Sequence, residues 1–332
     1  MADRFRPNRR VLLKGAAGLT AAFAASAPAR AQSSPDGGRF LRVETYASDI
    51  KDVDSVNTHW FDTDDGLVLV DAQRLLPEAE RAIALATRTG RPIAAVFITH
   101  AHTDHYGGLP VLRAAFPDVA IYATERTRKT IAEDTYGFNA GRRKRHKERF
   151  ATQAEISSAL PNRTLAHGQV VNIGGVLLQI TELTPGEADA TAMVHLPEHD
   201  IVFPGDFVQN GKVPMPFHSH ETWFAQLEAV LEHFPERTQS FQGHGRSGLL
   251  RDLIFETREY LMAARDLADT LAASVPHIDE AALKNAVDQM ILRFPHHVSG
   301  GGNPRDRVVP AVLRRIASQI AEGDKAAAPF AV

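Results

Sequence analysis

The 332-residue chain contains no cysteine. A disulfide framework is therefore excluded, and no thiolate can serve as a nucleophile or a metal ligand. The Gly-X-Ser-X-Gly pattern that presents a serine nucleophile in many hydrolases is also missing. Hydrolysis by this chain would therefore need an activated water in place of a thiol or a serine of that type.

A membrane-spanning apolar run is missing as well. The apolar stretch from Gly15 to about Ala27 is shorter than the roughly 20 residues that a spanning helix needs. It follows the twin arginine Arg9-Arg10 and precedes the small-residue pattern Ala29-Arg30-Ala31. Residues 1–31 are thus predicted to be a twin-arginine signal peptide that is removed. We expect the Tat machinery to export the folded protein to the periplasm, with no stable membrane anchor.

An excess of positive charge is absent too. Residues 1–31 hold six of the 37 Lys and Arg and one of the 40 Asp and Glu, which leaves 31 basic and 39 acidic residues, a net charge of −8. This balance disfavours a nucleic-acid partner. A composition of 44% hydrophobic and 23% charged residues predicts a globular enzyme, and a small-molecule substrate is its expected partner.

The most informative stretch runs from Val96 to Gly108. Its apolar, β-branched start predicts a buried strand. Three imidazoles and one carboxylate follow within six positions, at His100, His102, Asp104 and His105. At this spacing they cannot all reach one ion from a regular strand or helix, so a tight turn must direct them toward two neighbouring ions.

This His-X-His-X-Asp-His run after a strand resembles the signature of the metallo-β-lactamase superfamily of binuclear metallohydrolases. The resemblance implies an α/β fold of the αββα sandwich type, with two mixed sheets face to face, helices outside and the metal site at one sheet edge. It also implies that Asp71, at the end of a strand, is a carboxylate near the metal turn. A residue that merely ends the strand is the alternative.

A second segment, Thr184 to Thr191, precedes two predicted strands. Alignment with the family pattern puts Glu187 where most members have a histidine ligand, and Asp189 is the competing candidate. Glu-Ala-X-Ala after Pro-Gly resembles the alkyl-sulfatase branch, whose members are usually longer. A carboxylate is a harder ligand than imidazole, so manganese or iron is expected to be accepted beside zinc.

The remaining ligands implied by the resemblance are Asp206 and His244, each at a strand end. One ion would be held by His100, His102 and Glu187, and the other by Asp104, His105 and His244. Asp206 and a hydroxide would bridge them. The expected cofactors are two divalent metal ions, with zinc favoured, and Asp104 is the expected catalytic residue because it would orient the hydroxide.

Three features keep two interpretations each. His218 and His220 lie in a proline-stiffened loop and are either ordinary loop residues or groups that act on a substrate oxygen or a leaving group. The basic run 142–149 is either a solvated face or a region that attracts an anionic substrate.

Hydrophobic spacing predicts strands at 40–46, 58–70, 119–123 and 164–183, and helices at 77–89, 109–116, 223–234, 250–271, 280–294 and 310–320. The predicted division is a signal peptide 1–31, a hydrolase domain 40–248, and a C-terminal helical extension 249–322. This extension would pack on the same domain or line a homodimer contact.

The function predicted from these residues is an exported metal-dependent hydrolase that cleaves an ester, lactone, amide or sulfate-ester bond with a metal-bridging hydroxide. β-Lactam hydrolysis is less favoured, because Glu187 replaces the third histidine. Two further functions are compatible with the same residues. They are a mononuclear-iron thiol dioxygenase of the same fold and a non-catalytic periplasmic metal-dependent binding protein.

Overall fold

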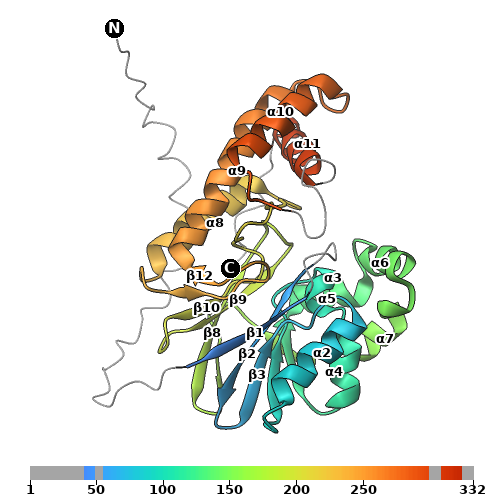
Figure 1. The fold of residues 1–332 in the computed structure, drawn as a ribbon, viewed down its shortest axis with the longest axis vertical. Helices are drawn as coiled ribbons and strands as arrows, with labels where there is room; N and C mark the ends of the chain where they lie inside the picture. The colour runs from blue at the N-terminus through green and yellow to red at the C-terminus, as the bar shows by residue number, and fades with distance from the viewer. Residues whose placement is uncertain (1–40, 49–54, 299–307, 324–332) are drawn as a thin grey trace.

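Two six-stranded β-sheets face each other in the part of the molecule that the structure describes, and helices cover their outer faces (Figure 1). The structure is a computed structural model that describes residues 41–48, 55–298 and 308–323. The layers run helix, sheet, sheet, helix, which confirms the predicted αββα sandwich. The predicted signal peptide, residues 1–31, lies outside the described residues.

The first sheet contains the strands of the N-terminal half in sequence order. Its first three strands are antiparallel, and the later neighbours are parallel. Its strands are β1 (Val43–Ala47), β2 (Asn57–Thr63), β3 (Gly66–Val70), β4 (Ile93–Phe97), β5 (Ala120–Thr124) and β6 (Arg163–Leu165).

The second sheet has the order β12-β11-β10-β9-β8-β7 and is antiparallel except between β10 and β11. Its strands are β7 (Val170–Ile173), β8 (Val176–Leu183), β9 (Thr191–Leu196), β10 (Ile201–Phe203), β11 (Gln239–Ser240) and β12 (Gly248–Leu249). Each sheet thus combines parallel and antiparallel neighbours, as expected.

Successive side chains along a strand point to opposite faces of the sheet, and here both faces are packed with apolar residues. Phe61 of β2 points between the sheets and stacks on Phe203 of β10 at a centroid distance of 5.7 Å. Its neighbour Trp60 points outward, into the cluster under the N-terminal helices. Because both faces are covered, the strands are nearly continuous apolar runs, and each fully buried side chain of this size contributes about 2 kcal/mol.

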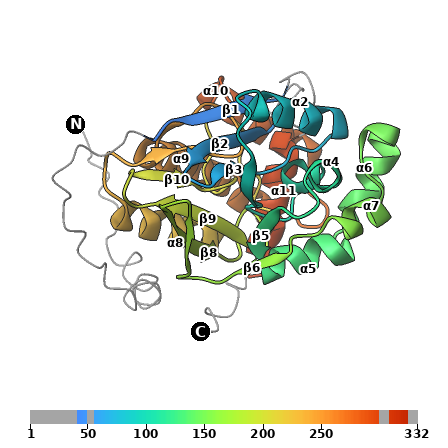
Figure 2. The ribbon, with the colours of Figure 1, turned by 90° about the horizontal axis from the view of Figure 1, so that it is seen from below.

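Helices from the two halves of the chain cover opposite outer faces (Figure 2). On the first sheet lie α2 (Leu76–Thr87), α4 (Leu109–Ala115), α5 (Glu125–Glu133) and α7 (Gln153–Ser158). On the second lie α8 (His220–His233) and the first half of α9 (Leu250–Ala272). Leu227 and Val230 of α8 share a buried cluster with Leu253 of α9.

The second half of α9 extends beyond the sheets and packs with α10 (Glu280–Arg293) and α11 (Val308–Ala321), as the upper part of Figure 1 shows. Val312 and Ile316 of α11 are fully buried against Ala264 of α9. No described helix has the length and apolar character needed to cross a membrane.

The hydrophobic spacing did not predict the helices between β5 and β6, which are α5, α6 and α7. The basic segment forms α6 (Phe138–His146), followed by a short 3-10 turn at Lys147–Arg149. The helix has no regular apolar stripe, and Asn139 is its one buried residue. Its amide side chain accepts a hydrogen bond from the Tyr106 hydroxyl at 2.7 Å, so a tertiary contact anchors this helix.

Candidate metal centre

The predicted ligands converge where strand ends of the two sheets meet. Four lie in the turn after β4 and in α3 (Thr103–Tyr106), and the others follow β8, β10 and β11. A single antiparallel bridge pairs His100 with Thr191, and the Ala192 N–H donates to the Thr99 carbonyl at 2.7 Å. The Asn57 N–H of β2 donates to the Gly243 carbonyl, after β11, at 2.7 Å. The backbone therefore joins the two sheets at the site itself.

Among the described residues, two groups of side chains have ligand atoms within 4.8 Å of one another. Asp206 belongs to both groups, so the groups adjoin. The first contains His100, His102, Glu187 and Asp206, and the second contains Asp104, His105, Asp206 and His244. The structure thus brings together all seven residues that the sequence singled out.

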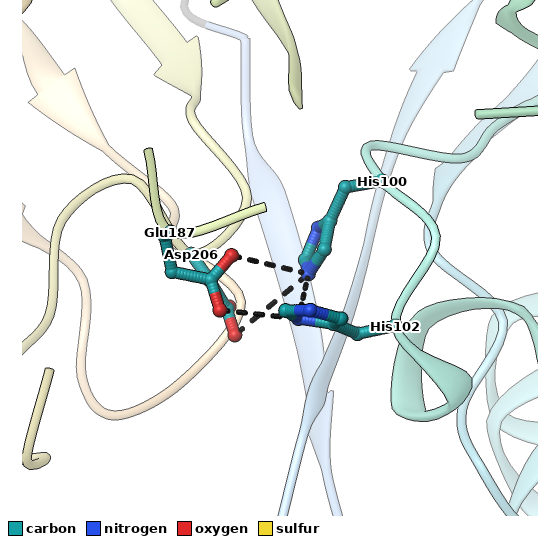
Figure 3. Close-up of side chains that lie close together, drawn as sticks. All are labelled: His100, His102, Glu187 and Asp206. Atoms are coloured by element: carbon teal, nitrogen blue, oxygen red, sulfur yellow. Dashed lines mark hydrogen bonds and ion pairs between the residues drawn. The ribbon is translucent and has the colours of Figure 1, made fainter. Parts of the chain in front are cut away.

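In the first group, two imidazoles face two carboxylates (Figure 3). The Nδ1 atom of His102 lies 3.1 Å from Oε1 of Glu187 and 3.0 Å from Nε2 of His100. The same nitrogen of His100 lies 3.7 Å from Oε2 of Glu187 and 4.0 Å from Oδ2 of Asp206. The four ligand atoms lie within 4.8 Å of one another, close enough to bind one ion together.

In the second group, one carboxylate oxygen of Asp206 is the common neighbour. Its Oδ2 lies 3.1 Å from Nε2 of His244 and 3.4 Å from Nε2 of His105. Oδ2 of Asp104 lies 3.2 Å from the same nitrogen of His244. Both rings therefore present Nε2 to the centre of the group.

Asp71 fixes the orientation of His105. Its Oδ2 lies 2.7 Å from Nδ1 of His105, and its Oδ1 accepts the Thr99 N–H at 2.9 Å. A proton on Nδ1 leaves the Nε2 lone pair free to face the site. Asp71 adopts a left-handed backbone conformation, with φ of 63°, directly after β3. Asp71 therefore contacts a predicted metal ligand. This agrees with the first interpretation of Asp71, a carboxylate near the metal turn, and not with a residue that merely ends the strand.

Two other rings are oriented in the same way. Nδ1 of His244 contacts the Ser55 carbonyl, and Nδ1 of His100 lies 3.0 Å from the Thr99 hydroxyl. A donor or acceptor on the far side of each ring leaves Nε2 directed at the centre.

The residues present fit divalent metal ions. Three buried polar atoms here have no hydrogen-bond partner, and they are Nε2 of His105, Oε2 of Glu187 and Oδ1 of Asp206. A Cβ atom at Gly243 would lie 2.2 Å from Oδ1 of Asp206 and 2.6 Å from Cε1 of His105, so no larger residue fits beside these atoms. Unpaired nitrogen and oxygen donors at a buried site suit a cation, since each would otherwise carry an uncompensated desolvation cost.

The electrostatics of the site favour positive charge. Burial favours the neutral form of His244, yet Asp206 and Asp104 outweigh it and raise the pKa of that ring to about 9. Burial would raise the pKa of Asp206, but His244 and His105 hold it well below its ordinary value. The pKa of Asp104 is likewise held well below its ordinary value, whereas burial raises the pKa of Glu187, so Asp104 and Asp206 are the ionised carboxylates that stabilise a cation here.

Arg74 is a neighbour of the site that the sequence analysis missed. Its guanidinium lies 2.9 Å from Oδ1 of Asp104, and its side chain is 5% exposed. Burial lowers the pKa of Arg74 to about 10, which leaves it charged at neutral pH. This pair directs one oxygen of Asp104 away from the metal centre and leaves the other for it. A basic residue three positions after Asp71, in the same strand-end loop, was the available signal.

A close backbone approach holds this loop against the metal turn. The Ala72 N–H donates to the His105 carbonyl at 2.7 Å. A Cβ atom at Gly107 would lie 2.2 Å from the Arg74 carbonyl oxygen, so only glycine permits the contact.

Three further residues considered in the sequence analysis, Asp189, His218 and His220, lie outside both groups. Asp189 pairs with Arg126 of α5 at 3.3 Å. His220 is fully buried at the start of α8, with its Nδ1 2.7 Å from Oε1 of Gln319. His218 lies beside the first group, with its ring centroid 5.7 Å from that of Tyr136.

Fold and site together define an αββα protein with a candidate metal centre where its two sheets meet. A comparison with protein families matches residues 52–244, more than half of the chain, to the metallo-beta-lactamase superfamily. The chain belongs to the metallo-β-lactamase superfamily.

Individual relatives agree with this assignment. Hydroxyacylglutathione hydrolase of Thermosynechococcus vestitus is 38% identical over 66 residues, which cover 20% of this chain and 26% of that protein. Acyl-coenzyme A thioesterase MBLAC2 of Gallus gallus is 29% identical over 177 residues, which cover 48% of this chain and 59% of that protein. The matches therefore span less than two thirds of either relative. A metallo-beta-lactamase family protein from Thermus thermophilus superposes with a TM-score of 0.61 at 16% identity, covering 85% of this chain and 93% of that structure.

Proposed function

We propose that the protein is a binuclear metallohydrolase that cleaves acyl esters or thioesters. The observation that carries the proposal is the pair of complete donor groups that share Asp206. Support for the bond type comes from relatives whose names describe hydrolysis of acyl compounds, hydroxyacylglutathione and acyl-coenzyme A. Esters, lactones and amides share the acyl carbon that such a site would activate.

Each group would hold one ion. The first ion would be bound by His100, His102 and Glu187, the second by Asp104, His105 and His244, and Asp206 would contact both. Two divalent ions bound there would lower the pKa of a shared water toward neutrality and polarise the acyl carbonyl. Asp104 would orient that water through Oδ2, because Arg74 occupies its other oxygen.

Glu187 would adjust the choice of metal. With Asp104 and Asp206 it gives three carboxylates for two ions, against imidazoles that are neutral when they ligate. A hard, anionic ligand lowers the Lewis acidity of its ion and favours manganese or iron more than a third imidazole would. We propose zinc as the resident metal, with iron or manganese as substitutes.

The hydrolase proposal is tested with purified protein, before and after metal removal, on acyl esters, thioesters, lactones, nitrocefin and alkyl sulfates. We expect metal-dependent hydrolysis of esters and thioesters, reduced at least about 100-fold in Asp104→Asn. Glu187→Gln should lose metal from the first group, whereas Asp189→Asn is the matched control and should keep both metal and activity. Full activity in Glu187→Gln, or hydrolysis that survives metal removal, would contradict the proposal.

We also propose export of the folded chain through the Tat pathway. The support is the sequence pattern of residues 1–31. Replacing Arg9 and Arg10 by lysine should retain the protein in the cytoplasm, measured by cell fractionation. Unchanged export of that variant would contradict this route.

A further inference from the structure

Four aromatic rings from two distant segments meet beside the first metal group. Tyr136 and Phe138 lie before and at the start of α6, and Phe217 and His218 lie in the loop that leads to α8. The ring centroids of Tyr136 and Phe138 are 5.4 Å apart, those of Tyr136 and His218 are 5.7 Å apart, and those of Phe138 and Phe217 are 6.4 Å apart. We call these four residues the aromatic wall.

The aromatic wall touches a ligand of the first group. The ring of His102 lies 4.8 Å from that of Phe217 and 5.8 Å from that of Phe138. The backbone N–H of His218 donates to the Gly186 carbonyl at 3.1 Å, directly before Glu187. The aromatic wall thus contacts the segments that carry two ligands of the first group, and its rings lie directly beside those ligands.

The four rings of the aromatic wall are not enclosed in the hydrophobic core. Tyr136 is 43% exposed, and Phe138, Phe217 and His218 are only half-buried. Partly exposed rings that gather around a polar centre provide an apolar contact surface next to it.

The aromatic wall carries no net charge. Burial lowers the pKa of His218 to about 4, so this ring is neutral at pH 7. The nearby Arg126 and Asp189 pair with each other. A charged substrate group would therefore find no counter-ion among the four rings, whereas an alkyl or aryl group would be desolvated favourably.

We propose that the aromatic wall is the subsite for the apolar acyl group of the substrate, which makes medium-chain or aryl-acyl esters and thioesters the preferred class. This inference rests on the proposed hydrolase function. The carbonyl would lie at the metal groups, and the chain would extend from His102 over Phe217 and Tyr136. Each further methylene buried on the rings should raise kcat/KM by about 4-fold, until the surface is covered.

The kinetic test uses one leaving group with acyl chains from acetyl to decanoyl. The octanoyl-to-acetyl ratio of kcat/KM should exceed about 10 in the wild type and fall at least about fivefold in Phe217→Ala and in Tyr136→Ala. Tyr136 is exposed, so its truncation does not endanger folding. Phe255→Ala, which removes a 44% exposed ring on α9, is the matched control and should leave the ratio unchanged. A wild-type ratio near 1, or equal ratios in wild type and both wall variants, overturns the inference.

A binding measurement separates this inference from the hydrolase proposal. Calorimetric titration of the metal-loaded protein with acetate, hexanoate and decanoate should show affinity that rises with chain length, and the rise should disappear in both wall variants. If that dependence is found without hydrolysis of any ester or thioester, the subsite is supported and the proposed function is overturned. If hydrolysis is found but affinity does not change with chain length, only the subsite is overturned.

Discussion

Asp71 and Arg74 each control a ligand-type residue without belonging to either donor group. Asp71 accepts the Nδ1 proton of His105 at 2.7 Å, and Arg74 contacts Oδ1 of Asp104 at 2.9 Å. Both come from the loop after β3, so one short segment orients two donors of the second group. Metal affinity should therefore depend on this loop nearly as strongly as on the donors.

Asp71→Asn should weaken the second metal about 10- to 100-fold, because an amide N–H facing His105 Nδ1 removes the acceptor that keeps Nε2 unprotonated. Competition with a chelator measures the effect. The matched control is Asp62→Asn, which alters an exposed carboxylate of β2 that pairs with Arg91. Equal affinities in the two variants would contradict this role of Asp71.

Arg74→Met should destabilise the metal-free protein by about 3 kcal/mol, because it leaves the Asp104 carboxylate buried without its cation. Bound metal would replace the lost partner, so the metal-loaded variant should lose less. Denaturant unfolding with and without metal measures both values. Lys284→Met, at an exposed ion pair with Asp288, should change stability by less than about 1 kcal/mol. The same loss in both metal states would show that Arg74 does not act through Asp104.

At the scale of elements, α6 depends on one buried contact with the metal turn. Tyr106 follows His105 in α3, and its hydroxyl donates to Oδ1 of Asn139 at 2.7 Å. Asn139 also donates to Oε1 of Gln153 at 2.5 Å, which connects α6 to α7. The position of α6 is therefore coupled to the helix that carries Asp104 and His105.

Tyr106→Phe and Asn139→Ala should each cost about 1–2 kcal/mol of unfolding free energy, since each leaves a buried group without its partner. The double variant should lose about 1 kcal/mol less than the sum of the single losses, because both remove the same bond. Urea unfolding of the wild type and the three variants gives the four unfolding free energies of this double-mutant cycle. Strict additivity would mean that the bond does not couple the two helices.

The sequence predicted those elements and ligands whose signals are local. The apolar runs marked the strands, and the His-X-His-X-Asp-His motif placed four donors in a single turn. Glu187, Asp206 and His244 were predicted only through the resemblance to the family pattern, because a single acidic or histidine residue near a strand end has no local signal of its own.

The remainder depends on tertiary contacts. The α6 helix has no apolar periodicity, so only the contact of Asn139 with Tyr106 reveals why it forms. The role of Arg74 follows from the structure, because the loop after β3 packs against α3 and brings Arg74 to Asp104. The aromatic wall joins residues about 80 positions apart, a pairing that no local pattern encodes.

At the scale of the whole molecule, the site joins the two halves of the sandwich. Four ligand-type residues follow the first sheet, and Glu187, Asp206 and His244 follow strands of the second. Three carboxylates among four imidazoles give the site a strong preference for cations, and protons and metal compete for it.

Metal binding at pH 7.5 should release about one proton or more per chain. The pKa of His244 is raised to about 9, so this ring is protonated before metal binds and must be neutral to ligate. Affinity should therefore rise with pH until about 9 and level off above it. Titration calorimetry in buffers of different ionisation enthalpy gives the proton number, which His218→Gln should not alter, because the pKa of His218 is about 4. No dependence on the buffer would contradict the assignment.

Metal stoichiometry joined to activity tests the central claim most directly. The metal-free protein is titrated with zinc, and hydrolysis of an acyl ester is followed at each addition, with bound metal measured by mass spectrometry. We predict that activity rises to a maximum at about two ions per chain, and that Glu187→Ala and His244→Ala each bind about one. Full activity at one ion per chain, or one bound iron with oxygen uptake and no hydrolysis, would contradict a binuclear hydrolase.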